Sequence, residues 1–151
     1  MTNIAVIGAG GRMGKALIET IAATDGVQLK GALENPQSSL IGVDAGELAG
    51  IGRNNIALVA SLQEIVGDFD ILIDFSIPSV TAANAAFCAA HGKKMVIGTT
   101  GLDQAQLQSV MQASHSNAVC MASNYATGVN LCFKLAELAA SVLGDEVDVE
   151  I

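Results

Sequence analysis

Short apolar runs recur along the chain, and a segment with the periodicity of a helix follows most of them. We predict strands at Ile4–Ile7, Val27–Leu33, Ile56–Val59, Ile71–Ile73, Met95–Ile97 and Ala118–Met121. We predict helices between them at Met13–Ala23, Leu62–Val66, Val80–His91 and Gln104–Ser114. Strands that alternate with helices form right-handed βαβ units, so this order predicts a doubly wound (Rossmann-like) α/β fold with a mostly parallel sheet.

Two predicted helices begin with a capping pattern, and one connection between elements is long. Ser61 with Glu64, and Asp103 with Gln106, have the spacing of a capping box. The glycine-rich stretch Asn35–Asn55 exceeds the usual length of a connection in a compact domain. This length favours either a functional loop or a mobile one.

The pattern changes after Ala126. A long helical run, Val129–Leu143, ends at Gly144, and Glu146–Ile151 then alternates acidic and apolar residues. Such alternation is typical of a strand with one exposed face, which does not suit the interior of a doubly wound sheet. We therefore predict a first domain over 1–126. Over 127–151 we predict a hinge and the first helix and strand of a truncated second domain of the α+β class.

Glycines cluster between the first predicted strand and the first predicted helix. Gly8, Gly11 and Gly14 form the pattern G-x-x-G-x-x-G, and Gly10 lies between them. The common dinucleotide fingerprint, G-x-G-x-x-G, would place a glycine at position 13, where this chain has Met13. Glycine lets the backbone turn tightly and approach a ligand, and the following helix offers N–H groups to phosphate. The segment therefore predicts a nucleotide site.

An acidic residue, Glu34, follows the second predicted strand, twenty residues after Gly14. At this place in a dinucleotide-binding unit a carboxylate accepts hydrogen bonds from the adenosine ribose, and it repels a 2′-phosphate. The alternative is a solvated acid at a strand end. Polar turns also follow three later strands, at Asp74–Pro78, Gly98–Gly101 and Ser123–Ala126. Ligands bind at the carboxyl ends of parallel strands, so these turns are further candidates, with plain strand-to-helix turns as the alternative.

Charge and composition exclude several kinds of partner. Of the 151 residues only seven are Lys or Arg, and the formal net charge is −8, which argues against nonspecific binding to nucleic acid or anionic membranes. No apolar run is long enough to span a membrane, and no basic secretory leader is visible. Cys88, Cys120 and Cys132 lack metal-binding spacing, so we predict buried thiols, no metal site and a cytoplasmic protein. His91 and His115 are predicted to cap helix ends.

Six blocks of sequence occur in order along the whole chain: Val6–Gly14, Ala32–Glu34, Ile73–Ser76, Val96–Gly101, Ser123–Tyr125 and Gly128–Asn130. Together they resemble the dihydrodipicolinate reductase family, whose members are also called 4-hydroxy-tetrahydrodipicolinate reductases. The first block (V-I-G-A-G-G-R-M-G) and the fourth (V-I-G-T-T-G) are specific in combination. The resemblance implies an NAD(P)H-dependent oxidoreductase that transfers a hydride to an unsaturated cyclic dicarboxylate in the diaminopimelate and lysine pathway.

The resemblance also implies which residues bind the cofactor. The pyrophosphate would be held by Gly8, Ala9, Gly10, Gly11, Arg12 and Met13. Glu34 would bind the adenosine ribose, Gly98, Thr99 and Thr100 would lie on the nicotinamide side, and Ala122, Ser123, Asn124 and Tyr125 would close the site near the hinge. Thr100 would also contact the substrate. By the same resemblance the full-length protein is a homo-oligomer, a tetramer assembled through the sheet of the second domain.

Two features depart from the family pattern. Relatives that accept NADPH often place an arginine after the ribose-binding acid, and this chain has the neutral Asn35 there, with Arg12 as the remaining nearby cation. We therefore predict that NADH is used at least as well as NADPH. The family's catalytic histidines and substrate lysines follow the strand predicted at Glu146, beyond Ile151. We therefore predict that the 151-residue chain binds the cofactor weakly or not at all and does not turn over.

Other functions remain open from the sequence alone. One is the cofactor domain of another NAD(P)-dependent dehydrogenase, of the homoserine or inositol type. A second is a non-catalytic nucleotide- or coenzyme A-binding module, against which Glu34 argues because coenzyme A lacks a free adenosine ribose diol. A third is a fragment that serves only in assembly, since an exposed strand edge with Val147, Val149 and Ile151 would favour association.

Overall fold

A computed structural model describes residues 1–144, 147–148 and 150 of the chain. It forms two compact units, Met1–Met121 and Ala122–Ile151, which we describe one at a time. The units divide five residues before the end of the first domain predicted over 1–126, and the domain assignment stays a prediction.

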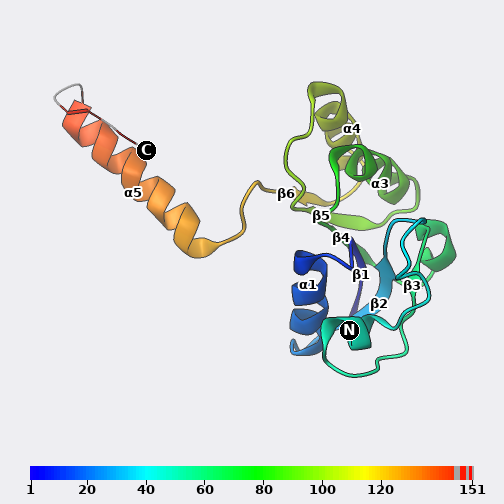
Figure 1. Cartoon of the computed structure of the whole chain (residues 1–151). Helices are drawn as coiled ribbons and strands as arrows, with labels where there is room; N and C mark the ends of the chain where they lie inside the picture. Colours follow the sequence, from blue (N-terminus) through cyan, green and yellow to red (C-terminus); the bar gives the residue numbers. More distant parts are fainter. Residues whose placement is uncertain (145–146, 149, 151) are drawn as a thin grey trace. The chain divides into compact units, whose positions relative to one another are not determined.

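The first unit contains a six-stranded sheet in the order β3-β2-β1-β4-β5-β6 (Figure 1). All five strand pairs are parallel. The strands are β1 (Thr2–Ile7), β2 (Val27–Leu33), β3 (Leu58–Val59), β4 (Ile71–Asp74), β5 (Lys94–Ile97) and β6 (Val119–Met121). The chain starts in the middle of the sheet, adds strands on one side as far as β3, and returns to add β4 on the other side of β1. The predicted doubly wound parallel sheet is therefore confirmed.

Helices connect the strands close to the predicted positions. They are α1 (Arg12–Ala22), α2 (Ala45–Ala49), the 3₁₀ helix η1 (Leu62–Ile65), α3 (Pro78–Ala90) and α4 (Gln104–Ser114). Both predicted capping boxes are present, at the starts of η1 and α4. Helix α3 begins two residues before the predicted Val80, because the fixed φ of Pro78 suits the first helical position.

The predicted strand Ile56–Val59 is shortened to its last two residues. The carbonyl of Ile56 accepts a hydrogen bond from the Ala45 N–H, and Ala57 forms an antiparallel bridge with Asp44. The first half of the expected strand therefore pairs with the preceding connection, so only Leu58 and Val59 join β2.

Apolar side chains cover both faces of the sheet, as the composition of a doubly wound fold requires. On one face, α1 contributes Ile18 and Ile21, which pack with residues of β1 and β2. On the other face, η1, α3 and α4 surround the buried ring of Phe69. The C-terminal edge of the sheet is left between these two layers.

The connection 35–55 has structure of its own. It contains α2, whose N-cap Asp44 accepts hydrogen bonds from the N–H groups of Gly46, Glu47, Asn54 and Asn55 at 2.7–3.1 Å. Desolvation alone would raise the pKa of Asp44, but the four backbone hydrogen bonds outweigh it and lower the pKa below its usual value. One carboxylate thus joins the start of α2 to the C-terminal end of this loop.

The thiols and imidazoles take structural positions. Cys88 is buried, and burial, with a further contribution from Asp74, raises the pKa of its thiol to about 12. The prediction of buried thiols is wrong for Cys120 and Cys132, which are exposed. His91 and His115 are the C-cap residues of α3 and α4, as predicted, and each Nδ1 lies 2.8 Å from a carbonyl oxygen of the preceding turn.

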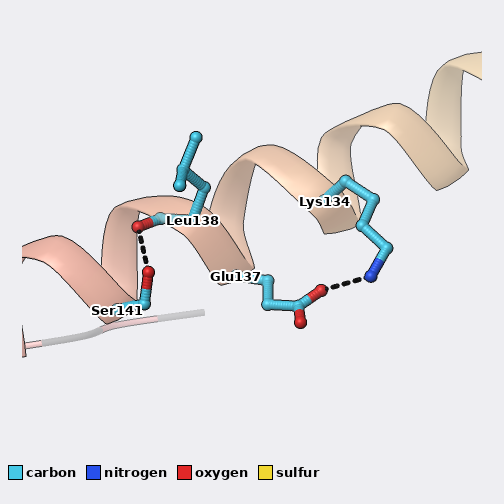
Figure 2. Close-up of polar contacts among 4 residues, drawn as sticks. All are labelled: Lys134, Glu137, Leu138 and Ser141. Carbon is cyan, nitrogen blue, oxygen red and sulfur yellow. Dashed lines mark hydrogen bonds and ion pairs between the residues drawn. The ribbon is translucent and has the colours of Figure 1, made fainter.

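The second unit consists of α5 (Thr127–Leu143) and the residues around it. No residue of this helix is buried. Its polar contacts are local: Lys134 Nζ lies 2.6 Å from Glu137 Oε2, and the Ser141 hydroxyl donates to the Leu138 carbonyl (Figure 2). The strand predicted at Glu146–Ile151 falls partly outside the described residues and stays a prediction. Within the described part of the chain, no helix combines the length and apolar character that a membrane span needs.

Candidate functional site

The glycine cluster forms a tight turn from β1 into α1. Gly8 has φ +75°, a backbone conformation that L side chains rarely adopt. The N–H groups of Gly8 and Ala9 both donate to the Leu33 carbonyl at 3.0 Å, and Gly11 donates to the Gly8 carbonyl at 3.0 Å. These hydrogen bonds hold the turn against the end of β2, next to Glu34.

Gly14 is required for a different reason, which is close packing. A Cβ atom at this position would lie 2.2 Å from the Gly8 carbonyl oxygen and 2.6 Å from Ala9 Cα, both backbone atoms. Only a residue without a side chain lets the first turn of α1 approach the turn this closely. The spacing from Gly8 to Gly14 is therefore explained by the close contact between these two residues, which lie at the two ends of the glycine turn.

The N-terminus of α1 suits an anion. Its N-cap, Gly11, supplies no side-chain cap, and the first turn contains no acidic residue. The N–H groups of Arg12, Met13 and Gly14 belong to the first turn, where a helix has no partners for them. Arg12 and Met13 are exposed. A phosphate at this point would meet unpaired donors and the positive end of the helix dipole.

Glu34 lies next to the glycine turn. Its carboxylate accepts the Gly10 N–H at 2.8 Å through Oε2 and the Asn35 N–H at 2.9 Å through Oε1. The side chain is half-buried. A Cβ added to Gly10 would lie 2.8 Å from this carboxylate and 2.5 Å from Leu40 Cδ1. The fold therefore brings together the predicted loop and the predicted acid, 24 residues apart in the sequence.

A cleft of about 720 Å³ opens at the C-terminal edge of the sheet. Gly8 and Gly11 border it at the end of β1, and Glu34 borders it at the end of β2. Its other walls come from the end of β3 and η1, from the β4–α3 turn, and from one face of α3. The remaining lining residues are Ile7, Leu33, Asn35, Pro36, Ala60, Ser61, Leu62, Gln63, Phe75, Ser76, Ile77, Val80, Ala83, Asn84 and Phe87. The cleft thus lies where the strand order reverses, the usual ligand position in an open α/β sheet.

A buried polar network supports the cleft from the end of β4. The Asp74 carboxylate, with no exposed surface, accepts the Ser76 N–H at 2.9 Å and the Ser76 hydroxyl at 2.5 Å. The Thr99 hydroxyl donates to Asp74 Oδ1 at 3.3 Å and accepts from the Thr81 hydroxyl at 2.8 Å. Asn84 donates its amide N–H to Asp74 Oδ2 at 3.1 Å. The network joins the turns after β4 and β5 to helix α3.

The turn Gly98–Thr99–Thr100 follows β5 but does not border the cleft. A Cβ at Gly98 would lie 2.0–2.6 Å from the Phe75 ring, so the glycine makes room for that aromatic side chain. Thr99 is 6% exposed and its hydroxyl serves the buried network, whereas Thr100 is exposed. Within the first unit, Thr100 is thus the threonine of this turn that is exposed to solvent, whereas the Thr99 hydroxyl is not available there.

The residues predicted to close the site, Ala122–Tyr125, belong to the second unit and are described only within it. Asn124 lies just before α5, whose N-cap is Ala126. Its Oδ1 accepts the Ala126 N–H at 2.9 Å, and its carbonyl accepts a hydrogen bond from the Asn130 side chain at 3.2 Å. Their assignment to the cofactor site stays a prediction.

The wall of the cleft that α3 provides was not predicted from the sequence. Val80, Ala83 and Phe87 line it at helical spacing, and Asn84 lies among them. A single polar residue on the apolar face of a helix was the pattern that could have indicated it. No group of acidic, His and Cys side chains suited to a metal ion occurs in the part of the chain that the structure describes.

The doubly wound sheet, the glycine turn, the uncapped start of α1 and the carboxylate after β2 define a dinucleotide-binding domain. The particular family follows from comparison with known proteins. The chain belongs to the dihydrodipicolinate reductase family, because residues 2–125 match the family described as "Dihydrodipicolinate reductase, N-terminus".

Individual relatives agree with this assignment. The chain is 51% identical over 150 residues to the 4-hydroxy-tetrahydrodipicolinate reductase of Saccharophagus degradans, a match that covers 99% of this chain and 56% of the relative. A dihydrodipicolinate reductase from Paenisporosarcina sp. TG-14, solved with dipicolinate bound, has a similar fold (TM-score 0.74, 24% identity), covering 93% of this chain and 54% of that one.

A second solved structure, like the first, shares the fold alone. GenD2 from gentamicin A biosynthesis, solved with NAD, superposes with a TM-score of 0.68 at 20% identity, covering 89% of this chain and 38% of that one. The chain spans just over half the length of the Saccharophagus degradans and Paenisporosarcina reductases described above.

Proposed function

We propose that this chain is the cofactor-binding part of a 4-hydroxy-tetrahydrodipicolinate reductase of the diaminopimelate and lysine pathway. The observation that carries the proposal is the Glu34 carboxylate, 2.8 Å from the Gly10 N–H at the edge of a cleft that opens at the strand reversal. The 51% identity to a reductase of that name supports the substrate class, an unsaturated cyclic dicarboxylate.

The chain's own residues bind and orient a nicotinamide cofactor in this proposal. The first-turn N–H groups of α1 hold the pyrophosphate, and Glu34 accepts hydrogen bonds from the adenosine ribose hydroxyls. Reduced nicotinamide supplies the hydride when it is bound. Gly98–Thr100 and Ala122–Tyr125 line the nicotinamide side, and Thr100 also contacts the substrate. The proton donor and most groups that hold the dicarboxylate belong to the second half of the reductase, which also makes the oligomer interface of a cytoplasmic enzyme.

A chimaera tests the proposal. Residues 1–150 of this chain would replace the matched region of the Saccharophagus degradans reductase, so that the second half comes from the relative. We expect the chimaera to reduce the cyclic substrate with NADH, and we expect the 151-residue chain to be inactive. Glu34→Ala in the chimaera should raise the KM for NADH roughly 10- to 100-fold, because hydrogen bonds to a charged group contribute about 1.5–3 kcal/mol.

Two results would contradict this function. A correctly folded chimaera that binds neither NADH nor NADPH would show that the cleft is not a cofactor site. Turnover by the isolated 151-residue chain would show that the catalytic groups lie within it. Glu47→Ala, an exposed acid in α2 outside the cleft, is the matched control for removing a carboxylate and should leave the KM for NADH unchanged.

We further propose that NADH is used at least as well as NADPH. A 2′-phosphate would lie beside the Glu34 carboxylate, which repels it, and Asn35 has no charge to compensate. Asn35→Arg in the chimaera should raise kcat/KM for NADPH relative to NADH by about tenfold, since a guanidinium can pair with the phosphate in a bidentate way.

The ratio of kcat/KM for the two cofactors, measured for the parent chimaera and Asn35→Arg, decides the question. Asn35→Gln keeps a neutral amide and should leave the ratio unchanged. A clear NADPH preference in the parent chimaera would overturn the proposal and would direct attention to Arg12 as the phosphate partner.

A further inference from the structure

Asn84 is a polar side chain at the inner wall of the cleft, on helix α3. It is 9% exposed, and it borders the cleft together with Ala83 and Phe87. Its amide nitrogen donates to Asp74 Oδ2 at 3.1 Å. Neither the glycine motif nor the reaction proposed above uses this residue.

The contact with Asp74 fixes which way the amide faces. A carboxylate only accepts hydrogen bonds, so the NH₂ group must point to Asp74 and Oδ1 must point away from it. The described residues provide no hydrogen bond to Oδ1, and none of their fully buried side-chain nitrogen or oxygen atoms lacks a partner. Oδ1 therefore borders the open space of the cleft as an available acceptor.

Asp74 itself holds this orientation firmly. Its carboxylate is completely buried and also accepts from the Ser76 N–H, the Ser76 hydroxyl and the Thr99 hydroxyl. Rotation of the Asn84 amide would place its oxygen against a buried carboxylate, which is electrostatically unfavourable. The acceptor is thus oriented before any ligand arrives, and a ligand gains affinity from it without an ordering cost.

The space in front of Oδ1 suits a flat apolar ring that carries a donor. Val80, Ala83 and Phe87 form one wall on α3, and Ile7 and Leu33 come from the ends of β1 and β2. Glu34 borders the same cleft. If Glu34 binds the adenosine ribose, the apolar space beside it receives the adenine ring; to this extent the inference rests on the proposed function.

We infer that Asn84 determines base specificity: its Oδ1 accepts a hydrogen bond from the 6-amino group of the cofactor's adenine. A purine with a 6-oxo group would place an acceptor against this fixed acceptor, and the Asn84 oxygen, covered by the bound purine, would be left without a partner. A site built to bind a donor discriminates strongly against an analogue that lacks it. Asn84 thereby selects adenine dinucleotides over hypoxanthine dinucleotides.

Nicotinamide hypoxanthine dinucleotide, reduced form, tests the inference because it replaces the 6-amino group of the NADH purine by a 6-oxo group, with N1 changing from an acceptor to an N–H donor. We would measure dissociation constants for both nucleotides with the chimaera. The parent should bind NADH roughly tenfold or more tightly than the hypoxanthine analogue. In Asn84→Ala the two constants should become equal. The change should fall on Kd and KM and leave kcat alone, because the purine is remote from the carbon that transfers the hydride.

A control variant separates recognition from support of the fold. Thr81→Val removes a hydroxyl from the same buried network but does not border the cleft, so the ratio of the two constants should stay at the parent value. The ratio compares two ligands on one protein, so partial unfolding of a variant cancels. If Asn84→Ala does not fold, Asn84→Ser can replace it, because its hydroxyl can still donate toward Asp74. In this variant too, the ratio of the two dissociation constants should fall to about one.

The outcomes distinguish this inference from the proposed function. Equal binding of the two nucleotides by the parent, or a ratio that survives Asn84→Ala, overturns the role of Asn84 and leaves the reductase proposal intact. A folded chimaera that binds neither nucleotide overturns both. Tenfold discrimination that only the Asn84 variants lose supports the assignment.

Discussion

At the scale of single residues, Gly14 offers the sharpest test of the loop. A Cβ atom there would lie 2.2 Å from a backbone oxygen, and backbone cannot move aside as a side chain can. We expect Gly14→Ala to lower the free energy of unfolding by about 3 kcal/mol, in the range of overpacked sites. The measurement is urea unfolding followed by circular dichroism.

Gly67→Ala is the matched control for that substitution. A Cβ at Gly67 would meet nothing within 4 Å, so the change should be neutral or stabilise by about 0.4–1 kcal/mol through the unfolded chain. If Gly14→Ala proves as mild as Gly67→Ala, the close approach of α1 to the Gly8 turn is not rigid.

The residues also show what sequence could and could not predict about the site. Gly8, Gly14 and Glu34 were predictable because each satisfies a local rule: a turn, a close contact and a strand end. Asp74 was predicted only as part of a candidate turn. Its contact with Asn84 was not predictable, because it depends on how β4 and α3 pack together. Thr99, which was predicted on the nicotinamide side, shows the same limit, since the hydrogen bond from its hydroxyl to Asp74 was not predicted.

At the scale of elements, the loop 35–55 depends on Asp44. Its pKa is lowered in the folded chain, so the carboxylate contributes stability that is fully present above its unfolded pKa of about 3.9 and is lost as pH falls through the folded value. Asp44→Asn should therefore lower the unfolding midpoint in urea at pH 7, and the difference from the parent should narrow toward pH 3.

Asp25→Asn removes a carboxylate from an exposed position after α1 and controls for the change in net charge. A difference between Asp44→Asn and the parent that stays constant from pH 7 to pH 3 would contradict the role of the ionised carboxylate.

The boundaries of helices were predictable where a capping box marks the first turn. The boundary of a strand was not predictable where it depends on hydrogen bonds to a distant segment of the chain. The Ser61 and Asp103 boxes placed the starts of η1 and α4 correctly. Helix α2 escaped prediction because its five residues are too few for a periodic pattern. The predicted strand at Ile56 failed because Ala45 and Asp44 compete for its first residues.

At the scale of the whole molecule, α5 predicts association of the chain. Leu131, Phe133, Leu138 and Val142 are each more than half exposed, and an apolar surface of this kind marks a contact with another chain or domain. We expect the 151-residue chain to increase in mass with concentration in light scattering after size exclusion. Leu131→Glu with Leu138→Glu should keep it monomeric.

Ser141→Glu adds a charge at another position of the same helix and should leave the association unchanged. A chain that stays monomeric at every concentration would contradict the prediction. The doubly wound architecture and the parallel direction of the strands were predictable at this scale, because strands that alternate with helices form right-handed crossovers. How the second unit forms a domain was not predictable, since no residue of α5 is buried within the described unit.

The strand order also has a consequence for the time course of synthesis. β1 is made first, yet its partner Ile71 in β4 lies 67 residues after Ile4. At about 5–20 residues per second, the ribosome takes roughly 3–13 s to deliver that partner. During this interval β1 can pair only with β2, and its other edge is an open template for any neighbouring nascent strand. A pause in translation before residue 71 would prolong that exposure.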